Sequence, residues 1–234
     1  MLVILKRGGI LFIVLLLIVS FLICALYTPD ADEAAAAGAE VIVIDAGHGA
    51  PDGGAVGTKT GVLEKDLNLA ISRKLSQKLA EAGERVLMTR EEDNGLYTEK
   101  EATLRAKKQA DMKRRVALAN TEGNLCLVSI HMNHFTDAKY SGPQIFYAAG
   151  SEDGKRLAEE IRQSILAEIG PHCTREIKPS DNLYLLRQTK IPAVIVECGF
   201  LSNAEEEALL IEEGYQDALA AAICSGIQSF KKTV

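Results

Sequence analysis

The stretch VIVIDAGHG, residues 41–49, joins a run that is apolar on both faces to a histidine placed just after it. A short β-branched run of this kind is typical of a strand buried in the middle of a sheet. Four further runs are expected to be strands: 85–89 (RVLMT), 125–130 (LCLVSI), 144–148 (QIFYA) and 193–197 (AVIVE). The sequence therefore predicts a sheet whose central strands are covered on both sides.

Longer segments alternate with these strands and carry apolar residues at three- and four-residue spacing. They span residues 66–82, roughly 102–121, 154–169 and 215–230, and they predict amphipathic helices. Asp66 is expected to cap the first helix and Gly83 to end it. The alternation predicts a single α/β domain with a largely parallel twisted sheet and helices on both faces. In such sheets ligands bind at the carboxyl ends of the strands.

The N-terminal residues have a different composition. Residues 8–27 contain no charged residue, and about 20 such residues in a helix span roughly 30 Å, the thickness of a bilayer core. Basic residues precede this run and acidic residues follow it, which predicts a cytoplasmic N-terminus. We expect a cytoplasmic segment (1–7), a transmembrane anchor (8–27), a linker (28–39) and an extracytoplasmic domain (40–234). A cleaved signal peptide, followed by secretion, is the alternative.

Charge and cysteine content narrow the class of protein. A net charge of −6 and a pI near 5.4 argue against a nucleic-acid partner, because phosphate binding needs clustered Lys and Arg. The basic run 100–115 is interrupted by acidic residues and is interpreted as a solvated helix face. Cys126, Cys198 and Cys224 lie in apolar runs, as buried free thiols do, and a disulfide framework is the less favoured alternative.

Four residues at or near strand ends are the candidates for chemistry. His48 follows the first strand and His131 follows the run 125–130, while Glu197 closes the last strand and Glu64 lies just ahead of the first helix. Two imidazoles and one carboxylate with an open fourth position are the ligand set of hydrolytic zinc sites. A second carboxylate can then carry the proton of a water molecule that zinc has made more acidic. The sequence therefore predicts a zinc ion with a neighbouring proton shuttle.

Each of these residues also has a simpler interpretation. The glycine-flanked turn at His48 is compatible with a phosphate-binding loop, and His131 with a buried core histidine. Glu64 also fits a first-turn residue that complements the helix dipole. Glu197 also fits a structural carboxylate whose hydrogen bonds are satisfied. The four residues taken together favour the zinc site.

Six motifs, in order along the chain, resemble those of zinc-dependent N-acetylmuramoyl-L-alanine amidases. They are VIVIDAGHGAPDGGAVG (41–57), LEKDLNL (63–69), MTREEDN (88–94), SIHMNHF (129–135), SGPQIFY (141–147) and AVIVECGFLSN (193–203). The resemblance implies that His48, Glu64 and His131 bind one Zn²⁺ ion per chain and that Glu197 is the catalytic acid/base. It implies hydrolysis of the amide between the lactyl group of N-acetylmuramic acid and L-alanine in peptidoglycan, at a bacterial cell membrane.

Finer features are most similar to the germination-specific amidases of spore-forming bacteria. These are LEKD, SGPQIFY, DNLYLLRQTKIPAVIVECGFLSNAEE (181–206) and the apolar N-terminal run, and they imply a role in spore-cortex maturation through muramic δ-lactam formation. A non-catalytic peptidoglycan-binding scaffold and a zinc peptidase or deacetylase on a similar fold are the rival functions. An accessory or activating protein is a further partner to be tested. His134 and His172 are expected in solvated loops, and the sequence assigns no role to Asn133, Arg90 or Arg115.

Overall fold

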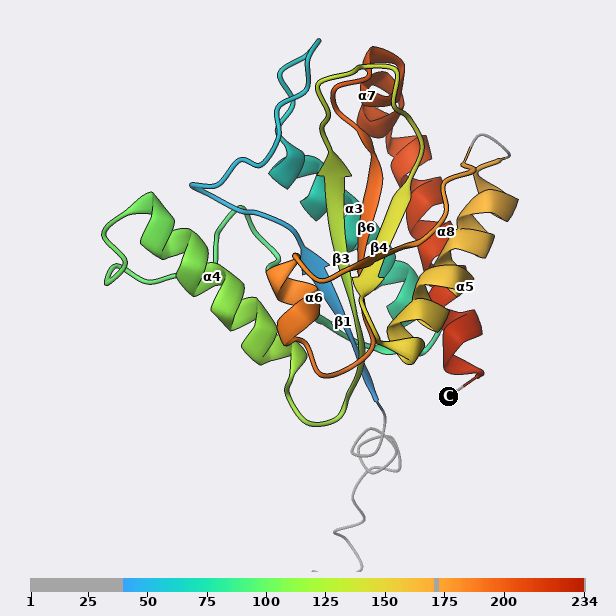
Figure 1. Cartoon of the computed structure of the whole chain (residues 1–234), viewed down its shortest axis with the longest axis horizontal. Helices are drawn as coiled ribbons and strands as arrows, with labels where there is room; N and C mark the ends of the chain where they lie inside the picture. Colours follow the sequence, from blue (N-terminus) through green and yellow to red (C-terminus); the bar gives the residue numbers. More distant parts are fainter. Residues whose placement is uncertain (1–39, 171–172, 234) are drawn as a thin grey trace, which may run out of the picture. The chain divides into compact units, whose positions relative to one another are not determined.

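The computed structural model describes residues 40–170 and 173–233, and Glu40–Val234 form one compact unit. Its described residues form a six-stranded sheet in the order β2-β1-β3-β6-β4-β5. Figure 1 labels the four central strands, β1, β3, β6 and β4. The strands are β1 (Val41–Ala46), β2 (Arg85–Met88), β3 (Asn124–Asn133), β4 (Gln144–Ala148), β5 (Lys178–Ser180) and β6 (Ala193–Phe200). The helices are α3 (Glu64–Glu81), α4 (Leu104–Ala119), α5 (Glu152–Glu168), α6 (Tyr184–Gln188), α7 (Ala204–Ile211) and α8 (Glu213–Lys231).

The sheet is mixed, with a parallel majority. Strands β2, β1, β3 and β6 run parallel to one another, and β5 runs parallel to β4. Strand β4 runs antiparallel to β6. The reason is the connection from β3, because the short loop 134–143 contains no helix and parallel strands need a longer crossover. The predicted α/β class with a largely parallel sheet is confirmed, except that β4 and β5 run opposite to the other four strands.

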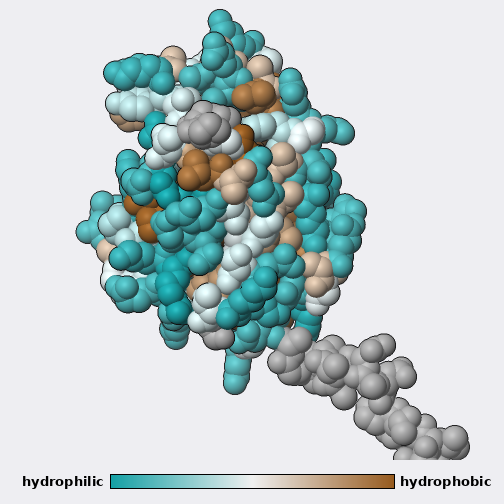
Figure 2. All heavy atoms as spheres, turned by 90° about the vertical axis from the view of Figure 1, so that its right-hand side faces the viewer, coloured by the Kyte–Doolittle hydropathy of each residue, from teal (hydrophilic) through white to brown (hydrophobic). Residues whose placement is uncertain are grey.

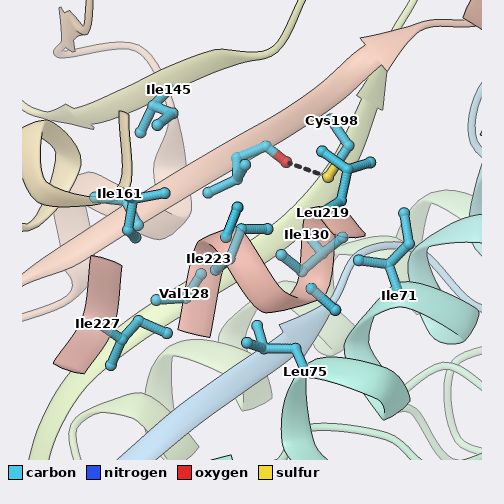
Figure 3. Close-up of a cluster of buried hydrophobic side chains, with 14 of the residues drawn as sticks. Ile71, Leu75, Val128, Ile130, Ile145, Ile161, Cys198, Leu219, Ile223 and Ile227 are labelled. Carbon is cyan, nitrogen blue, oxygen red and sulfur yellow. Dashed lines mark hydrogen bonds between the residues drawn. The ribbon is translucent and has the colours of Figure 1, made fainter. Parts of the chain in front are cut away.

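Helices cover both faces of the sheet. On one face α3, α5 and α8 pack over the larger core, while α4 and α6 cover the other face beside a smaller core. Figure 3 shows side chains of α3, β3, α5 and α8 converging in the larger core, including Ile71, Leu75, Val128, Ile130, Ile161 and Ile223. Each fully buried aliphatic side chain contributes about 1.5–3 kcal/mol relative to exposure. Burial of such side chains therefore holds the strands that carry the candidate residues.

The outer surface on the α5 and α8 side is mostly polar. Figure 2 shows charged and polar residues over most of this face, with hydrophobic residues in scattered places. This agrees with the amphipathic pattern of α5, whose buried positions recur at three- and four-residue spacing.

Two expectations for helix ends have different outcomes. Helix α3 begins at Glu64 with Leu63 as N-cap, so the prediction that Asp66 caps this helix is wrong. The first amides of α3 donate instead to carbonyls of the preceding loop, with Glu64 N bonded to Ala55 O at 2.9 Å. Gly83, with a φ of +83°, ends the helix as predicted, because its N–H donates to Ala80 O.

The predictions for residues 1–39, including the transmembrane anchor 8–27, lie outside the described residues. Among residues 40–170 and 173–233, no helix combines the length and the hydropathy needed to cross a bilayer.

The cysteines and the basic run can be placed directly. Cys126, Cys173, Cys198 and Cys224 are buried free thiols, so the interpretation against a disulfide framework is confirmed for them. Most residues of the basic run lie on exposed or half-buried positions around α4, as predicted. Arg115 is the exception, because it is 1% exposed and pairs with buried Asp45. The interpretation as a solvated face is therefore wrong at this position.

Candidate active site

The four candidate residues meet at one edge of the sheet. Strand β1 ends two residues before His48, and β3 carries His131 beside Glu197 of β6 in direct register. Glu64 is the first residue of α3, which packs against β1 and β3. The parallel direction of β1, β3 and β6 brings their carboxyl ends together, as the sequence predicted.

Glu64 lies between the two histidines. Its Oε1 is 3.1 Å from His48 Nε2 and 3.0 Å from His131 Nδ1. One donor atom from each of the three residues lies within 4.8 Å of the others, so that the three could hold a metal ion together. The two imidazole rings meet edge to face, with centroids 5.0 Å apart. Two nitrogens and one carboxylate oxygen, converging in this way, fit a divalent metal with an open coordination position.

The carboxylate of Glu64 is buried and fixed by the backbone. Its Oε2 accepts a hydrogen bond from Ala55 N at 2.7 Å, and its Oε1 accepts one from Met132 N at 3.1 Å. Burial would raise its pKa, but hydrogen bonds from the two histidines hold that pKa well below its usual range. Glu64 is therefore an anion in a fixed orientation, as a metal ligand must be.

Asp52 is a functional neighbour that the sequence analysis missed. Its Oδ2 lies 3.0 Å from His48 Nδ1, and Lys108 Nζ pairs with its Oδ1 at 2.8 Å. Burial would lower the pKa of His48, but hydrogen bonds to Asp52 and Glu64 raise it to about 9. A carboxylate that is hydrogen-bonded to the ring nitrogen not used for metal binding fixes the tautomer and orientation of a ligating histidine. The sequence feature that could have identified Asp52 is its place four residues after His48, in a turn rich in glycine and proline.

The loop after β1 has a backbone that few residues tolerate. His48 itself lies in the left-handed region with a φ of +61°, which is uncommon for a residue with a side chain. A Cβ on Gly47 would lie 2.3 Å from the His131 ring, and one on Gly54 would lie 2.5 Å from Glu64 Oε2. Glycine at these two positions therefore lets the backbone approach the ligand side chains.

Two buried arginines, Arg90 and Arg115, brace this loop. Arg90 donates to Ala46 O and Gly47 O, both at 2.9 Å, and to Lys65 O at 2.8 Å. Arg115 donates to Ala46 O at 2.7 Å and also to His48 O. The guanidinium groups thus tie together carbonyls at the end of β1, in the loop that follows it and in the first turn of α3.

Asp45 anchors the second of these arginines, and its replacement is expected to destabilise the fold. Burial would raise the pKa of Asp45, but Arg115, Ser129 and Thr89 lower it to about 2, below the value of about 3.9 in unfolded chains. The ionised form therefore stabilises the fold above about pH 4, and this contribution is lost as the pH falls towards 2. We expect Asp45→Asn to lower the free energy of unfolding by about 3–5 kcal/mol at pH 7.

Urea unfolding at pH 7, 5 and 3.5 measures this effect. The difference in unfolding free energy between wild type and Asp45→Asn should narrow at pH 3.5, because Asp45 of the unfolded wild type is then largely protonated while the folded form is still ionised. Asp217, half-exposed on α8 and paired with Lys78, provides the matched control, and Asp217→Asn should change stability little. Equal stability of Asp45→Asn and wild type at pH 7 would contradict the anchoring role.

Glu197 lies beside the metal-ligand cluster without joining it. Its Oε2 is buried and has no hydrogen-bond partner among the described residues. Burial, the largest influence, and Glu64 raise the pKa of Glu197 to about 7, against the lowering effect of His131. A buried carboxyl group with such a pKa is populated in both protonation states near neutral pH, as an acid/base requires.

A cavity of about 260 Å³ opens beside these residues. It is lined by His48, His131 and Glu197, and by larger side chains that include Tyr97, Leu104, Met112 and Tyr184. Leu104 is 52% exposed and Tyr184 is 38% exposed, so the cavity reaches the surface between α4 and α6. The arrangement can therefore admit a chain-like substrate to the metal ligands and the buried carboxyl group.

The remaining candidate residues lie away from this cluster. His134 is exposed in the loop after β3, in agreement with a solvated position, and His172 lies outside the described residues. Asn133 ends β3, where its carbonyl accepts the N–H of Leu201 at 2.8 Å. Cys198 is fully buried in the larger core, as its place in an apolar run predicted (Figure 3).

Comparison with known proteins gives a consistent result. Residues 42–229 match the family described as N-acetylmuramoyl-L-alanine amidase. The germination-specific N-acetylmuramoyl-L-alanine amidase of Bacillus subtilis is 37% identical over 188 residues, which cover 80% of this chain and 78% of that protein.

Two solved structures of amidases are similar over the same region. The CwlD amidase of Clostridioides difficile, in complex with the GerS lipoprotein, has a TM-score of 0.80 and 40% identity, covering 83% of this chain and 100% of that one. The catalytic domain of CwlV, an N-acetylmuramoyl-L-alanine amidase from Bacillus (Paenibacillus) polymyxa, has a TM-score of 0.69 and 32% identity, covering 83% and 99%. The chain therefore belongs to the N-acetylmuramoyl-L-alanine amidase family and is a hydrolase of peptidoglycan.

Proposed function

We propose that the amidase depends on zinc, held by His48, Glu64 and His131, with Glu197 as the catalytic acid/base. The observation that carries this proposal is the position of Glu64, whose Oε1 lies 3.0–3.1 Å from a nitrogen of each histidine. Two histidines and a carboxylate are a ligand set of hydrolytic zinc enzymes. The unpartnered Oε2 of buried Glu197, on the strand next to His131, supports its assignment to the proton transfers.

The chain's own groups then have separate tasks. Zinc, when bound, supplies a Lewis acid that polarises the substrate carbonyl and makes water more acidic. Glu197 accepts a proton from the attacking water and delivers it to the nitrogen of L-alanine as the C–N bond breaks. Asp52 holds His48 in the tautomer that leaves Nε2 unprotonated for the metal. The products are the lactyl carboxylate on the glycan and a peptide with a free L-alanine amine.

The test is digestion of peptidoglycan by the full chain, kept in mild detergent, with zinc added or removed by a chelator. We expect release of peptides that begin with L-alanine, by mass analysis, only when zinc is present. A peptidase would release shorter peptides, and a deacetylase would change the sugars. Full activity of the metal-free protein would reject zinc dependence, and no release by the zinc-loaded protein would favour the scaffold function.

We further propose spore-cortex peptidoglycan as the natural substrate. The support is the similarity to the germination-specific amidase of Bacillus subtilis, at 37% identity over most of both chains. Cleavage of stem peptides there would expose the lactyl carboxylate that δ-lactam formation requires. Parallel digestion of spore-cortex and vegetative peptidoglycan tests this proposal, and equal rates on the two would count against it.

The proposed location is a cell membrane, with residues 8–27 as a single-pass anchor and the catalytic domain outside the cytoplasm. The uncharged run and the basic residues before it support this location. Protease digestion of intact and of permeabilised cells tests it, because an external domain is degraded in both and a cytoplasmic one only in the second.

An accessory lipoprotein is the proposed protein partner. The support is the complex of the similar Clostridioides difficile amidase with the GerS lipoprotein. Purification of the tagged chain from sporulating cells should recover a lipoprotein in a stoichiometric amount, and its absence under several extraction conditions would count against the partner.

A further inference from the structure

A second cavity, of about 280 Å³, lies beside the first and is named here the β4 cavity. Its lining includes Phe135, Tyr140, Gln144, Arg175, Lys178 and Phe200. Gln144 of β4 is directly opposite Glu197 of β6 in the sheet, and Glu197 is opposite His131 of β3. Neighbouring strands are about 4.8 Å apart, so the β4 cavity begins one strand beyond Glu197, on the side away from the metal ligands.

This position decides which part of the substrate faces the β4 cavity. The amide carbonyl must lie at the metal ligands, while the amine nitrogen must lie within reach of Glu197 to receive its proton. A vector from His131 through Glu197 therefore runs from the acyl side of the scissile bond to its amine side. Continued by one strand, it leads to Gln144 and the β4 cavity. The peptide that leaves with the L-alanine amine is thus directed into this cavity.

The β4 cavity has the chemistry of a site for an acidic peptide. Its described lining carries two cationic residues, Arg175 and Lys178, and no acidic one, although the whole chain has a net charge of −6. The guanidinium of Arg175 stacks over the Phe200 ring at 4.7 Å and the Tyr140 ring at 5.5 Å. Its Nε donates to Ser141 O at 2.6 Å, which fixes the group and engages one of its five N–H donors.

Gln144 offers a separate indication of a ligand. It is 2% exposed, and its Nε2 donates to Glu176 O at 2.6 Å. Its Oε1 is buried and has no hydrogen-bond partner among the described residues. A buried amide oxygen without a donor is costly, and a peptide N–H entering the cavity would satisfy it.

We propose that the β4 cavity is the subsite for the leaving peptide, in which Arg175 binds the α-carboxylate of the second residue and Gln144 accepts a peptide N–H. Lys178, exposed at the rim, adds to the positive potential that favours an acidic peptide. This inference rests on the proposed role of Glu197, because that role fixes the direction of the peptide.

Two synthetic substrates test the proposal: N-acetylmuramoyl-L-alanyl-D-glutamate and the analogue with its α-carboxylate converted to a carboxamide. Wild type should prefer the free carboxylate in kcat/KM by about 10- to 100-fold, the usual range for a charge-assisted hydrogen bond. Arg175→Met keeps an apolar stem over the rings and should remove this preference by lowering kcat/KM only for the substrate with the free α-carboxylate. Lys178→Met should reduce the preference by a few-fold.

Arg187 provides the matched control, because its guanidinium also stacks on a tyrosine ring, 6.0 Å from Tyr184, outside the β4 cavity. Arg187→Met should keep the wild-type preference. If Arg175→Met lowers kcat/KM equally for both substrates, Arg175 has a structural role and the proposal is overturned. A wild type that shows no preference between the two substrates would also overturn it. If the zinc-loaded wild type hydrolyses neither substrate, the result contradicts the proposed zinc mechanism. If it hydrolyses both at equal rates, the zinc mechanism stands and only the proposed peptide subsite is rejected.

Discussion

Replacement of Glu197 by glutamine is expected to lower kcat by about 10²- to 10⁴-fold, the usual contribution of a general acid/base, while zinc content stays at the wild-type level. Glutamine has nearly the same volume as glutamate, so the buried position on β6 can still be filled. It can neither accept the proton of water nor deliver one to the L-alanine nitrogen. KM should change little if Glu197 acts in the transition state rather than in substrate binding.

The measurement combines initial rates on a muramoyl peptide with metal analysis of the same sample. Glu205, exposed in the first turn of α7, provides the control, and Glu205→Gln should leave kcat unchanged. Residual kcat within about tenfold of wild type would exclude Glu197 as the main proton carrier. Loss of zinc along with activity would instead place Glu197 among the ligands.

Replacement of His131 by alanine is expected to remove both the metal and the activity. The variant keeps one histidine and Glu64, and two ligands are one fewer than catalytic zinc sites use. Glu64 Oε1 also loses the hydrogen bond from His131 Nδ1, so that a buried carboxylate is left with fewer partners. We expect no zinc after dialysis and a kcat/KM at the level of the metal-free wild type.

Thermal unfolding gives a second readout that does not depend on activity. Zinc should raise the Tm of the wild type, because a ligand that binds only the folded state stabilises it, and should leave the Tm of His131→Ala unchanged. His134, exposed three residues further along the chain, is the control, and His134→Ala should keep both zinc and activity. Full zinc occupancy in His131→Ala would remove this residue from the ligand set.

The sequence predicted the parts of the fold that follow from strong local patterns. Runs such as VIVID and AVIVE are apolar on both faces, and a central strand covered by helices is the arrangement that buries both. The same strands place His48, His131 and Glu197 at one edge, because parallel strands end together. Three of the four candidate residues could therefore be brought together from strand ends alone, whereas Glu64 stands at the start of the first helix.

Other parts depended on contacts that local patterns do not encode. Strand β5 and helix α6 span only residues 178–180 and 184–188, too short for a periodic signal, and α7 was also not expected. Strand β4 has a clear strand pattern, but its direction depends on the length of the loop that precedes it. Arg115 lies in a basic run that suggests a solvated face, and only the tertiary structure shows that it reaches Asp45.

The four buried thiols have a consequence for chemical probing. Burial raises the pKa of Cys126 to about 12 and also raises that of Cys198, so that the reactive thiolate is scarce in the folded protein. Alkylating reagents can therefore reach these sulfur atoms only when β3 or β6 separates from the helices that cover it. The alkylation rate of Cys126 and Cys198 therefore measures how often β3 and β6, the strands that carry His131 and Glu197, open transiently.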